Sequence, residues 1–157
     1  NKKRCKGGTR MQESMHMLLY RAFHAQCNIL RPYMRALGLG AGQPKLIAYL
    51  AEHGPCRQSE LADYFSIDPA AISRMVESLE KGGFIAVEAD KSNRRRKSLS
   101  ATDRGREAAR AWMAKRAQVE EIMLRGFSPE EREAFSACLT RALKNYVDWR
   151  EEHPCET

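Results

Sequence analysis

The sequence predicts a mainly α-helical protein with one small β-hairpin. Most of its 157 residues lie in segments whose apolar residues recur three or four positions apart, which is the spacing of an amphipathic helix. Two of these segments begin with a good N-cap residue followed by proline, a pair typical of a helix start. One short stretch instead alternates with the period of a strand. A hydrophobic fraction of 43% is enough for a compact core.

A long N-terminal helix is expected from Met15 to about Leu37, because its apolar residues form a stripe at helical spacing. Pro32 lies inside this pattern and lacks a backbone N–H donor, so we expect a kink or a local unwinding there. The glycine-rich stretch LGLGAGQP, residues 37–44, then ends the helix.

Three shorter helices are expected next. The first, KLIAYLAEHGP, is closed by Gly54, and the second, RQSELADYFSI, buries Leu61, Ala62 and Phe65. The third begins with Asp68 as N-cap and Pro69 at the first helical position, and it ends at a pair of glycines. Its inward face carries apolar residues at positions i, i+3, i+4 and i+7, which are Ile72, Met75, Val76 and Leu79.

A short strand, FIAVEAD, follows these helices, and a weak return strand is expected around Leu99. Between them lies DKSNRRRKS, residues 90–98, with three consecutive arginines. A charge run taken alone is usually a solvated loop. Because this run follows a capped helix and lies between two strands, we interpret it as the tip of a hairpin.

Two further helices complete the chain. One is expected from Thr102 to about Arg125, where alanine and arginine favour helix. The other begins with Ser128 as N-cap and Pro129 at the first position, and Glu131 completes a capping box. The apolar stripe of this last helix needs a surface to pack on. The first helix and the Thr102 helix are candidates, within one chain or across a dimer.

Charge and composition narrow the function. The net charge of +7 and the pI of about 9.3 favour a polyanionic partner, either a nucleic acid or an anionic membrane surface. No apolar run approaches the roughly 20 residues of a membrane span. The basic N-terminal segment is not followed by the apolar region of a signal peptide. We therefore expect a soluble intracellular protein.

The sequence offers no catalytic or metal-binding pattern. The five cysteines are odd in number and scattered, at Cys5, Cys27, Cys56, Cys138 and Cys155. Without a CxxC pair, neither a zinc site nor a disulfide framework is expected. The chain also has no glycine-rich phosphate loop, nucleophile elbow or HExxH pattern. We expect no enzyme activity, no cofactor and no metal.

The order of elements is that of a winged helix-turn-helix. In this arrangement the second helix of a tight pair enters the major groove of DNA. The third short helix presents small outward residues, Ala70, Ala71 and Ser73, which let its backbone approach closely. Arg74 can reach a guanine edge from there. The alternative is an ordinary surface arginine.

The stretch from Leu37 to Gly105 resembles the MarR family of bacterial transcriptional regulators. The motifs that carry the resemblance are LGL…GQP, QSELAD, ISRMVESLEKGGFI, and a wing arginine, Arg95, followed by Thr102 and Gly105. In this order and spacing they are specific. The resemblance implies a winged helix-turn-helix domain at 41–101 and a helical dimerisation region made of 1–40 and 102–157.

The resemblance also implies the function. Such a protein is a cytoplasmic bacterial homodimer that binds double-stranded DNA specifically at a pseudo-palindromic operator, as a repressor. It is commonly relieved by a small phenolic or lipophilic effector. By position, the residues expected on DNA are Ala70, Ala71, Ser73 and Arg74 of the recognition helix, Asn93, Arg94, Arg95 and Arg96 of the wing, and Arg57, Gln58, Ser59, Lys91 and Lys97 on the DNA backbone.

This chain departs from the family pattern at three positions. Asn93 replaces the aspartate two residues before the wing arginine, which weakens the hydrogen bond to that arginine by roughly half. Arg57 replaces a threonine cap, at a cost of about 1 kcal/mol, although its charge can contact a phosphate. Ala101 replaces a leucine, which thins the packing beneath the hairpin.

A sensor site is sought on the first helix. His16, Tyr20, His24 and Cys27 fall within about 80° of one another, beside the apolar stripe. They are candidates for a ligand pocket between the dimer core and the DNA-binding domain, or simply polar residues that border a helix interface. His16 and His24 are about 12 Å apart along the axis, too far to share a metal.

Three other functions stay open. One is a basic module that binds nucleic acid without sequence preference, and another is a redox regulator that senses oxidants through a cysteine. The peroxide-sensing branch has its cysteine near the start of the first helix, where this chain has His16. The third is a purely structural dimerisation protein. The ratio of operator to random-duplex affinity separates a specific regulator from a generic module.

Overall fold

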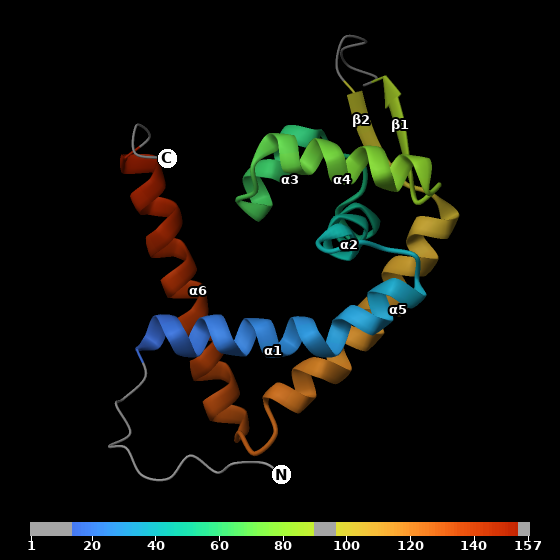
Figure 1. Cartoon of the computed structure of the whole chain (residues 1–157). Helices are drawn as coiled ribbons and strands as arrows, with labels where there is room; N and C mark the ends of the chain where they lie inside the picture. Colours follow the sequence, from blue (N-terminus) through green and yellow to red (C-terminus); the bar gives the residue numbers. More distant parts are fainter. Residues whose placement is uncertain (1–13, 90–96, 154–157) are drawn as a thin grey trace, which may run out of the picture. The chain divides into compact units, whose positions relative to one another are not determined.

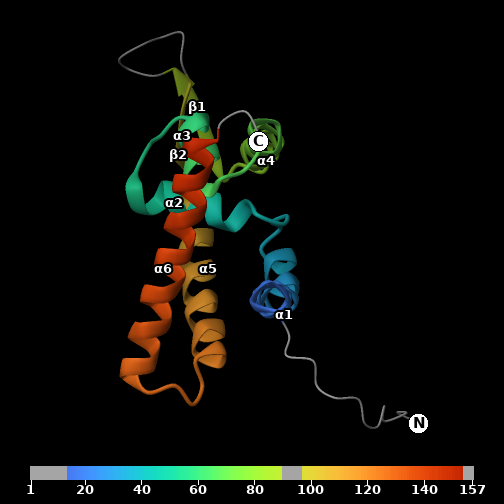
Figure 2. The same ribbon diagram turned by 90° about the vertical axis from the view of Figure 1, so that its left-hand side faces the viewer.

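The computed structural model describes residues 14–89 and 97–153 and confirms a mainly helical chain with one hairpin (Figures 1 and 2). In chain order the elements are α1 (Met15–Ala36), α2 (Gln43–His53), α3 (Gln58–Phe65), α4 (Pro69–Lys81), β1 (Ile85–Ala89), β2 (Lys97–Ala101), α5 (Asp103–Met123) and α6 (Pro129–Glu152). The chain forms two compact units, residues 1–119 and 120–157. Within the described residues, no helix is long and apolar enough to cross a membrane.

The predicted N-caps set the starts of α4 and α6. The carboxylate of Asp68 accepts a hydrogen bond of 2.9 Å from the backbone N–H of Ala71. The Ser128 hydroxyl accepts from the N–H of Glu131 at 3.2 Å, and the Glu131 carboxylate accepts from the N–H of Ser128 at 2.8 Å. Each bond satisfies a backbone donor that the helix itself cannot use, so both capping predictions are confirmed.

Two helices form despite a residue that ordinarily disfavours them, a proline inside α1 and an arginine at the N-cap of α3. The helix α1 continues through Pro32, so the expected local unwinding is wrong. Pro32 and Asn28 are both exposed, and water can bond the Asn28 carbonyl that the proline leaves without a donor. At the start of α3 the Arg57 guanidinium has no acceptor atom. The Glu60 carboxylate still accepts from the Arg57 N–H at 3.0 Å, which preserves half of a capping box.

The core of the first unit lies between α2, α3, α4, the hairpin and the first half of α5. Its fully buried side chains include Leu46, Ile47, Leu61, Ile72, Leu79 and Leu99. The inward face expected for α4 is confirmed at Ile72, Val76 and Leu79. Phe65 and Met75, expected inside, are half-buried and pack on the edge of this cluster.

The hairpin contributes one face to this core. Its antiparallel register pairs Ile85 with Ala101 and Val87 with Leu99 on that face. A third backbone segment joins the sheet, because Cys56 exchanges two hydrogen bonds with Leu99, of 3.1 and 2.8 Å. The sheet is therefore tied to the chain segment that leads into α3. Ala101 is buried in this core.

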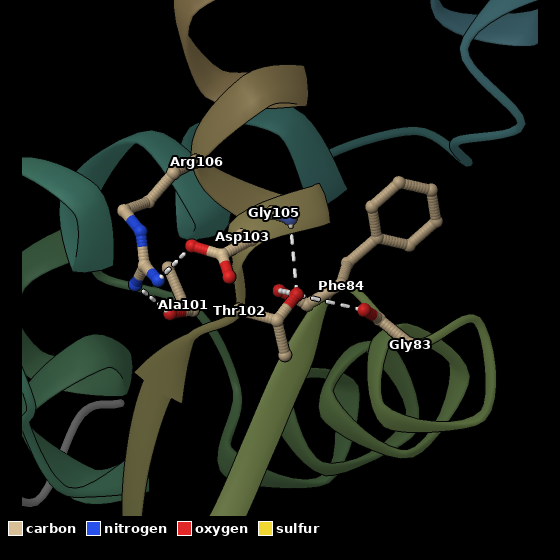
Figure 3. Close-up of polar contacts among 7 residues, drawn as sticks. All are labelled: Gly83, Phe84, Ala101, Thr102, Asp103, Gly105 and Arg106. Carbon is tan, nitrogen blue, oxygen red and sulfur yellow. Dashed lines mark hydrogen bonds and ion pairs between the residues drawn. The ribbon is translucent and has the colours of Figure 1, made fainter.

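The junction between β2 and α5 is unusually close-packed (Figure 3). A Cβ atom added to Gly105 would lie 2.0 Å from the carbonyl oxygen of Phe84, nearer than any real Cβ approaches another atom. Beside it, the Thr102 hydroxyl accepts a hydrogen bond of 3.0 Å from the N–H of Gly105. The first turn of α5 is thus pressed against the start of β1, which requires glycine at this position.

The second unit contains the end of α5 and all of α6. Arg132 of α6 forms an ion pair with Glu121 at 2.8 Å, and the hydrogen bond from this guanidinium lowers the pKa of the Glu121 carboxyl. No side chain of α6 is buried. An exposed apolar stripe runs along the helix, formed by Phe135, Leu139, Leu143, Tyr146 and Val147.

Gly105→Ala should destabilise the protein by about 1–3 kcal/mol, because the new methyl group has no room beside Phe84. A loss of stability is the informative result, because replacing glycine by alanine inside a helix ordinarily stabilises a protein by up to about 1 kcal/mol. Urea unfolding followed by circular dichroism measures the change. The control is Gly40→Ala, whose Cβ would meet only the Gln43 side chain, at 3.4 Å or more. Equal stability of Gly105→Ala and wild type would contradict the close approach.

Candidate nucleic-acid interface

The helix α4 is amphipathic, with one face buried in the core and the opposite face exposed. Ile72, Val76 and Leu79 are buried against the core. Ala70, Ser73 and Arg74 are exposed on the other side, and Ala71 is half-buried near the capped end. Small residues at the exposed positions let the backbone of a helix approach another surface closely. The helix lies beside α3 and the hairpin (Figure 1).

Arg74 is the exposed group on α4 best suited to reading a base. Its side chain makes no hydrogen bond or ion pair with any other residue in the described part of the chain. The guanidinium is planar, always charged and carries five N–H donors. It can therefore donate two parallel hydrogen bonds to the O6 and N7 atoms of guanine.

The start of α3 provides a second group of polar residues. Ser59 is exposed, while Gln58 and Arg57 are half-buried. They stand at a helix N-terminus, where backbone N–H groups and the helix dipole favour a negative charge. Arginine, glutamine and serine side chains can donate hydrogen bonds to phosphate oxygens from such a position.

The hairpin carries the remaining predicted contacts. Lys97, the first residue of β2, is exposed. The other wing residues assigned from the sequence, Lys91, Asn93 and the arginines at 94–96, lie outside the described residues. Their part in binding stays a prediction.

A cavity that the sequence analysis missed lies between the entry to α3 and the outer face of the hairpin. Its volume is about 430 Å³, and its lining is Pro55, Cys56, Arg57, Glu60, Glu88, Ala89, Ser98 and Ser100. The pairing of Cys56 with Leu99 brings the two sides together. Polar residues alternate with core residues along both strands, and this pattern was the one sequence signal for the cavity.

Burial changes the acidity of the Cys56 thiol, which lines this cavity. Removal from solvent, with a smaller effect of the nearby Glu60 carboxylate, raises its pKa to about 11. The thiolate is the nucleophilic form of cysteine, so at neutral pH this side chain behaves as a small apolar group.

The four sensor candidates on α1 are brought together only in part. His16, Tyr20 and His24 are exposed and Cys27 is half-buried. The rings of Tyr20 and His24 lie in contact, with centroids 4.3 Å apart. Within residues 14–89 and 97–153 no group of three His, Cys, Asp or Glu side chains is placed to hold a metal ion.

A capped helix with an open polar face, preceded by a short helix and followed by a β-hairpin wing, defines a winged helix-turn-helix DNA-binding domain. The model of the MarR family matches residues 41–97, which span this domain. The regulator YybA of Bacillus subtilis (strain 168), an uncharacterized HTH-type transcriptional regulator, is 32% identical over 114 residues. That match covers 72% of this chain and 76% of YybA.

Two solved structures share the fold. A MarR family transcriptional regulator from Listeria monocytogenes, solved in complex with a 26mer DNA, matches with a TM-score of 0.82 at 23% identity and covers 87% of this chain and 91% of its own. BpsR of Bordetella bronchiseptica, whose DNA binding is regulated by 6-hydroxynicotinic acid, matches with a TM-score of 0.76 at 24% identity, covering 87% and 97%. The chain belongs to the MarR family of transcriptional regulators.

Cys56 should react with iodoacetamide at pH 8 more than tenfold slower than the exposed Cys138, because a pKa of about 11 leaves little thiolate. Mass spectrometry of the tryptic peptides separates the cysteines. In concentrated guanidinium chloride the two rates should converge, which controls for differences between the peptides. Equal rates in the native protein would contradict the burial of this thiol.

Proposed function

We propose that this chain acts in the bacterial cytoplasm as a homodimeric repressor that binds a pseudo-palindromic operator in double-stranded DNA. The observation that carries the proposal is the exposed face of α4, where Arg74 has no partner among the described residues. A guanidinium in that position, on a helix free to enter the major groove, reads guanine. The DNA complex of the Listeria monocytogenes regulator supports this use of the fold.

The proposed DNA contacts fall into two groups, residues that contact base edges and residues that contact phosphates or follow the groove. Ser73 and Arg74 face the base edges, with Ala70 and Ala71 allowing the approach. Arg57, Gln58 and Ser59 bind phosphates from the start of α3, and Lys91 and Lys97 do so from the wing. Arg95, flanked by Asn93, Arg94 and Arg96, enters the minor groove, where it responds to groove width and potential.

Apolar surface on the long helices supports the homodimer. On α1, Met15 is 80% exposed, and on α6 Tyr146 and Leu143 are 68% and 62% exposed. Large apolar patches on a folded chain mark surfaces that another protein covers. We assign residues 1–40 and 102–157 to the dimerisation region and 41–101 to the DNA-binding domain. Two such domains bind successive major grooves of a symmetric site.

A small phenolic or lipophilic effector is proposed to relieve repression. The proposal is supported by BpsR, a protein of this fold whose DNA binding is regulated by the small molecule 6-hydroxynicotinic acid. His16, Tyr20, His24 and Cys27 are the candidate contacts on α1. An aromatic ring and two imidazoles along one edge suit a planar ligand that carries a hydroxyl or carboxylate group.

The net charge of +7 favours a second candidate, a module that binds nucleic acid without sequence preference. Its affinity for a selected duplex and for a scrambled duplex of the same length would be equal. A specific regulator should prefer the selected duplex by about 10³-fold or more. A redox regulator, the third candidate, requires Cys27 to react with alkylating agents faster than the other cysteines.

Arg74→Ala should weaken binding to the duplex that wild type selects from a random library by about 1–3 kcal/mol. Binding to scrambled duplex should change little, because the substitution removes a hydrogen-bonding group that faces a base. Fluorescence anisotropy titration at fixed salt measures both. Arg116→Ala, which removes the same charge from an exposed position on α5, should leave the ratio unchanged. Equal decreases on both duplexes would show that Arg74 is not a reader.

Leu143→Glu should shift the protein from dimer to monomer, because the carboxylate would be placed in the apolar stripe that we assign to the dimer. Light scattering during size-exclusion chromatography gives the mass. Asn145→Glu is the matched control, since it adds the same charge two residues along, nearly opposite on the helix. If Leu143→Glu keeps the wild-type mass, this stripe is not the dimer interface.

A further inference from the structure

Thr102 joins the end of β2, the start of α5, the residue that precedes β1 and the turn that ends α4 at one point (Figure 3). It stands between the last residue of β2 and the first residue of α5. Its backbone N–H donates a hydrogen bond of 3.1 Å to the carbonyl of Phe84, where β1 begins. Its hydroxyl lies 2.7 Å from the carbonyl oxygen of Gly83, to which it donates, and accepts from the N–H of Gly105 at 3.0 Å.

This arrangement fixes the base of the hairpin from both sides. Gly83 belongs to the turn that ends α4 and has a positive φ of 70°. Phe84 is buried, and the guanidinium of Arg104, in the first turn of α5, lies 4.4 Å from the centre of its ring. Gly105 contacts the Phe84 carbonyl too closely for any side chain. The Thr102 hydroxyl thus bonds to α5 and to the α4–β1 turn together.

The second strand continues from this base to the wing. Lys97 lies five residues before Thr102 along β2, so at about 3.3 Å per residue the two positions are about 16 Å apart. A tilt of about 10° at the base would move Lys97 by about 3 Å, which is the whole length of a hydrogen bond. The angle of the hairpin therefore decides whether Lys97 reaches a phosphate.

The geometry points to Thr102 as a positioning residue for DNA binding. Its hydroxyl holds the hairpin at the angle at which Lys97 meets the DNA backbone, while α4 is held separately by its buried face. This inference rests on the proposed function. It assigns a role to a threonine outside the residues that we propose to contact DNA, and it accounts for the spacing of Thr102 and Gly105, which both lie against the carbonyl of Phe84.

The test compares Thr102→Val, which removes the hydroxyl and keeps the shape, with Thr102→Ser, which keeps the hydroxyl. In the full-length protein, Thr102→Val should bind the selected duplex about tenfold more weakly. The slope of log affinity against log salt should become shallower by about 0.9 for each phosphate that the protein no longer neutralises. Thr102→Ser should restore affinity and slope to near wild type.

Two combined variants locate the effect. Adding Thr102→Val to Lys97→Ala should cost much less than adding it to wild type, because both changes act on the same phosphate. Adding it to Arg74→Ala should multiply the two effects on affinity. The control is Ser128→Ala, which removes the N-cap of α6 and should leave the salt slope unchanged. Without DNA, amide hydrogen exchange of residues 97–101 should be about tenfold faster in Thr102→Val.

The outcomes separate the two ideas. A wild-type chain that binds neither duplex overturns the proposed function, and the positioning role in DNA binding with it. Specific binding by wild type together with unchanged affinity and slope in Thr102→Val overturns the positioning role alone. So does a Thr102→Ser variant as weak as Thr102→Val, or a multiplicative effect in the Lys97 combination.

Discussion

The contact between the backbone of α5 and the carbonyl of Phe84 is the constraint on which the DNA-binding elements depend. Because Gly105 has no side chain, the first turn of α5 reaches the start of β1. This brings β2 back onto the core, where Leu99 and Ala101 are buried. Without that approach, the hairpin would lose its anchor to α5 at the end of β2.

The same contact explains why the polar groups at this junction are satisfied. Thr102 donates through its backbone N–H and its hydroxyl and also accepts from Gly105. Arg106 adds bonds to the carbonyl of Ala101 and the carboxylate of Asp103. Among the described residues, no buried side-chain nitrogen or oxygen lacks a partner. The end of a strand and the start of a helix each leave backbone groups without a hydrogen-bond partner. At this junction those groups bond to one another.

Local signals in the sequence predicted the elements and much of the core. Asp68 and Ser128 predict where α4 and α6 begin, because each forms a short-range N-cap hydrogen bond. The spacing of Ile72, Val76 and Leu79 predicts the buried face of α4. Features that depend on distant segments were not predictable. The pairing of Cys56 with Leu99 and the cavity beside it join residues more than forty positions apart. At Pro32 the expected local unwinding does not occur, because exposure lets water replace the bond that proline removes.

The exposed face of α4 was predicted from the spacing of its apolar residues, because a helix that packs one side on the core exposes the other. In α4 the buried residues Ile72, Val76 and Leu79 are distinct from the exposed residues Ser73 and Arg74. Exposed substitutions away from caps usually change stability by less than about 0.5 kcal/mol. Ser73 and Arg74 can therefore be exchanged for other residues while the fold persists. Such a chain can diverge toward a new target sequence in single steps, and each intermediate remains a folded protein on which selection can act.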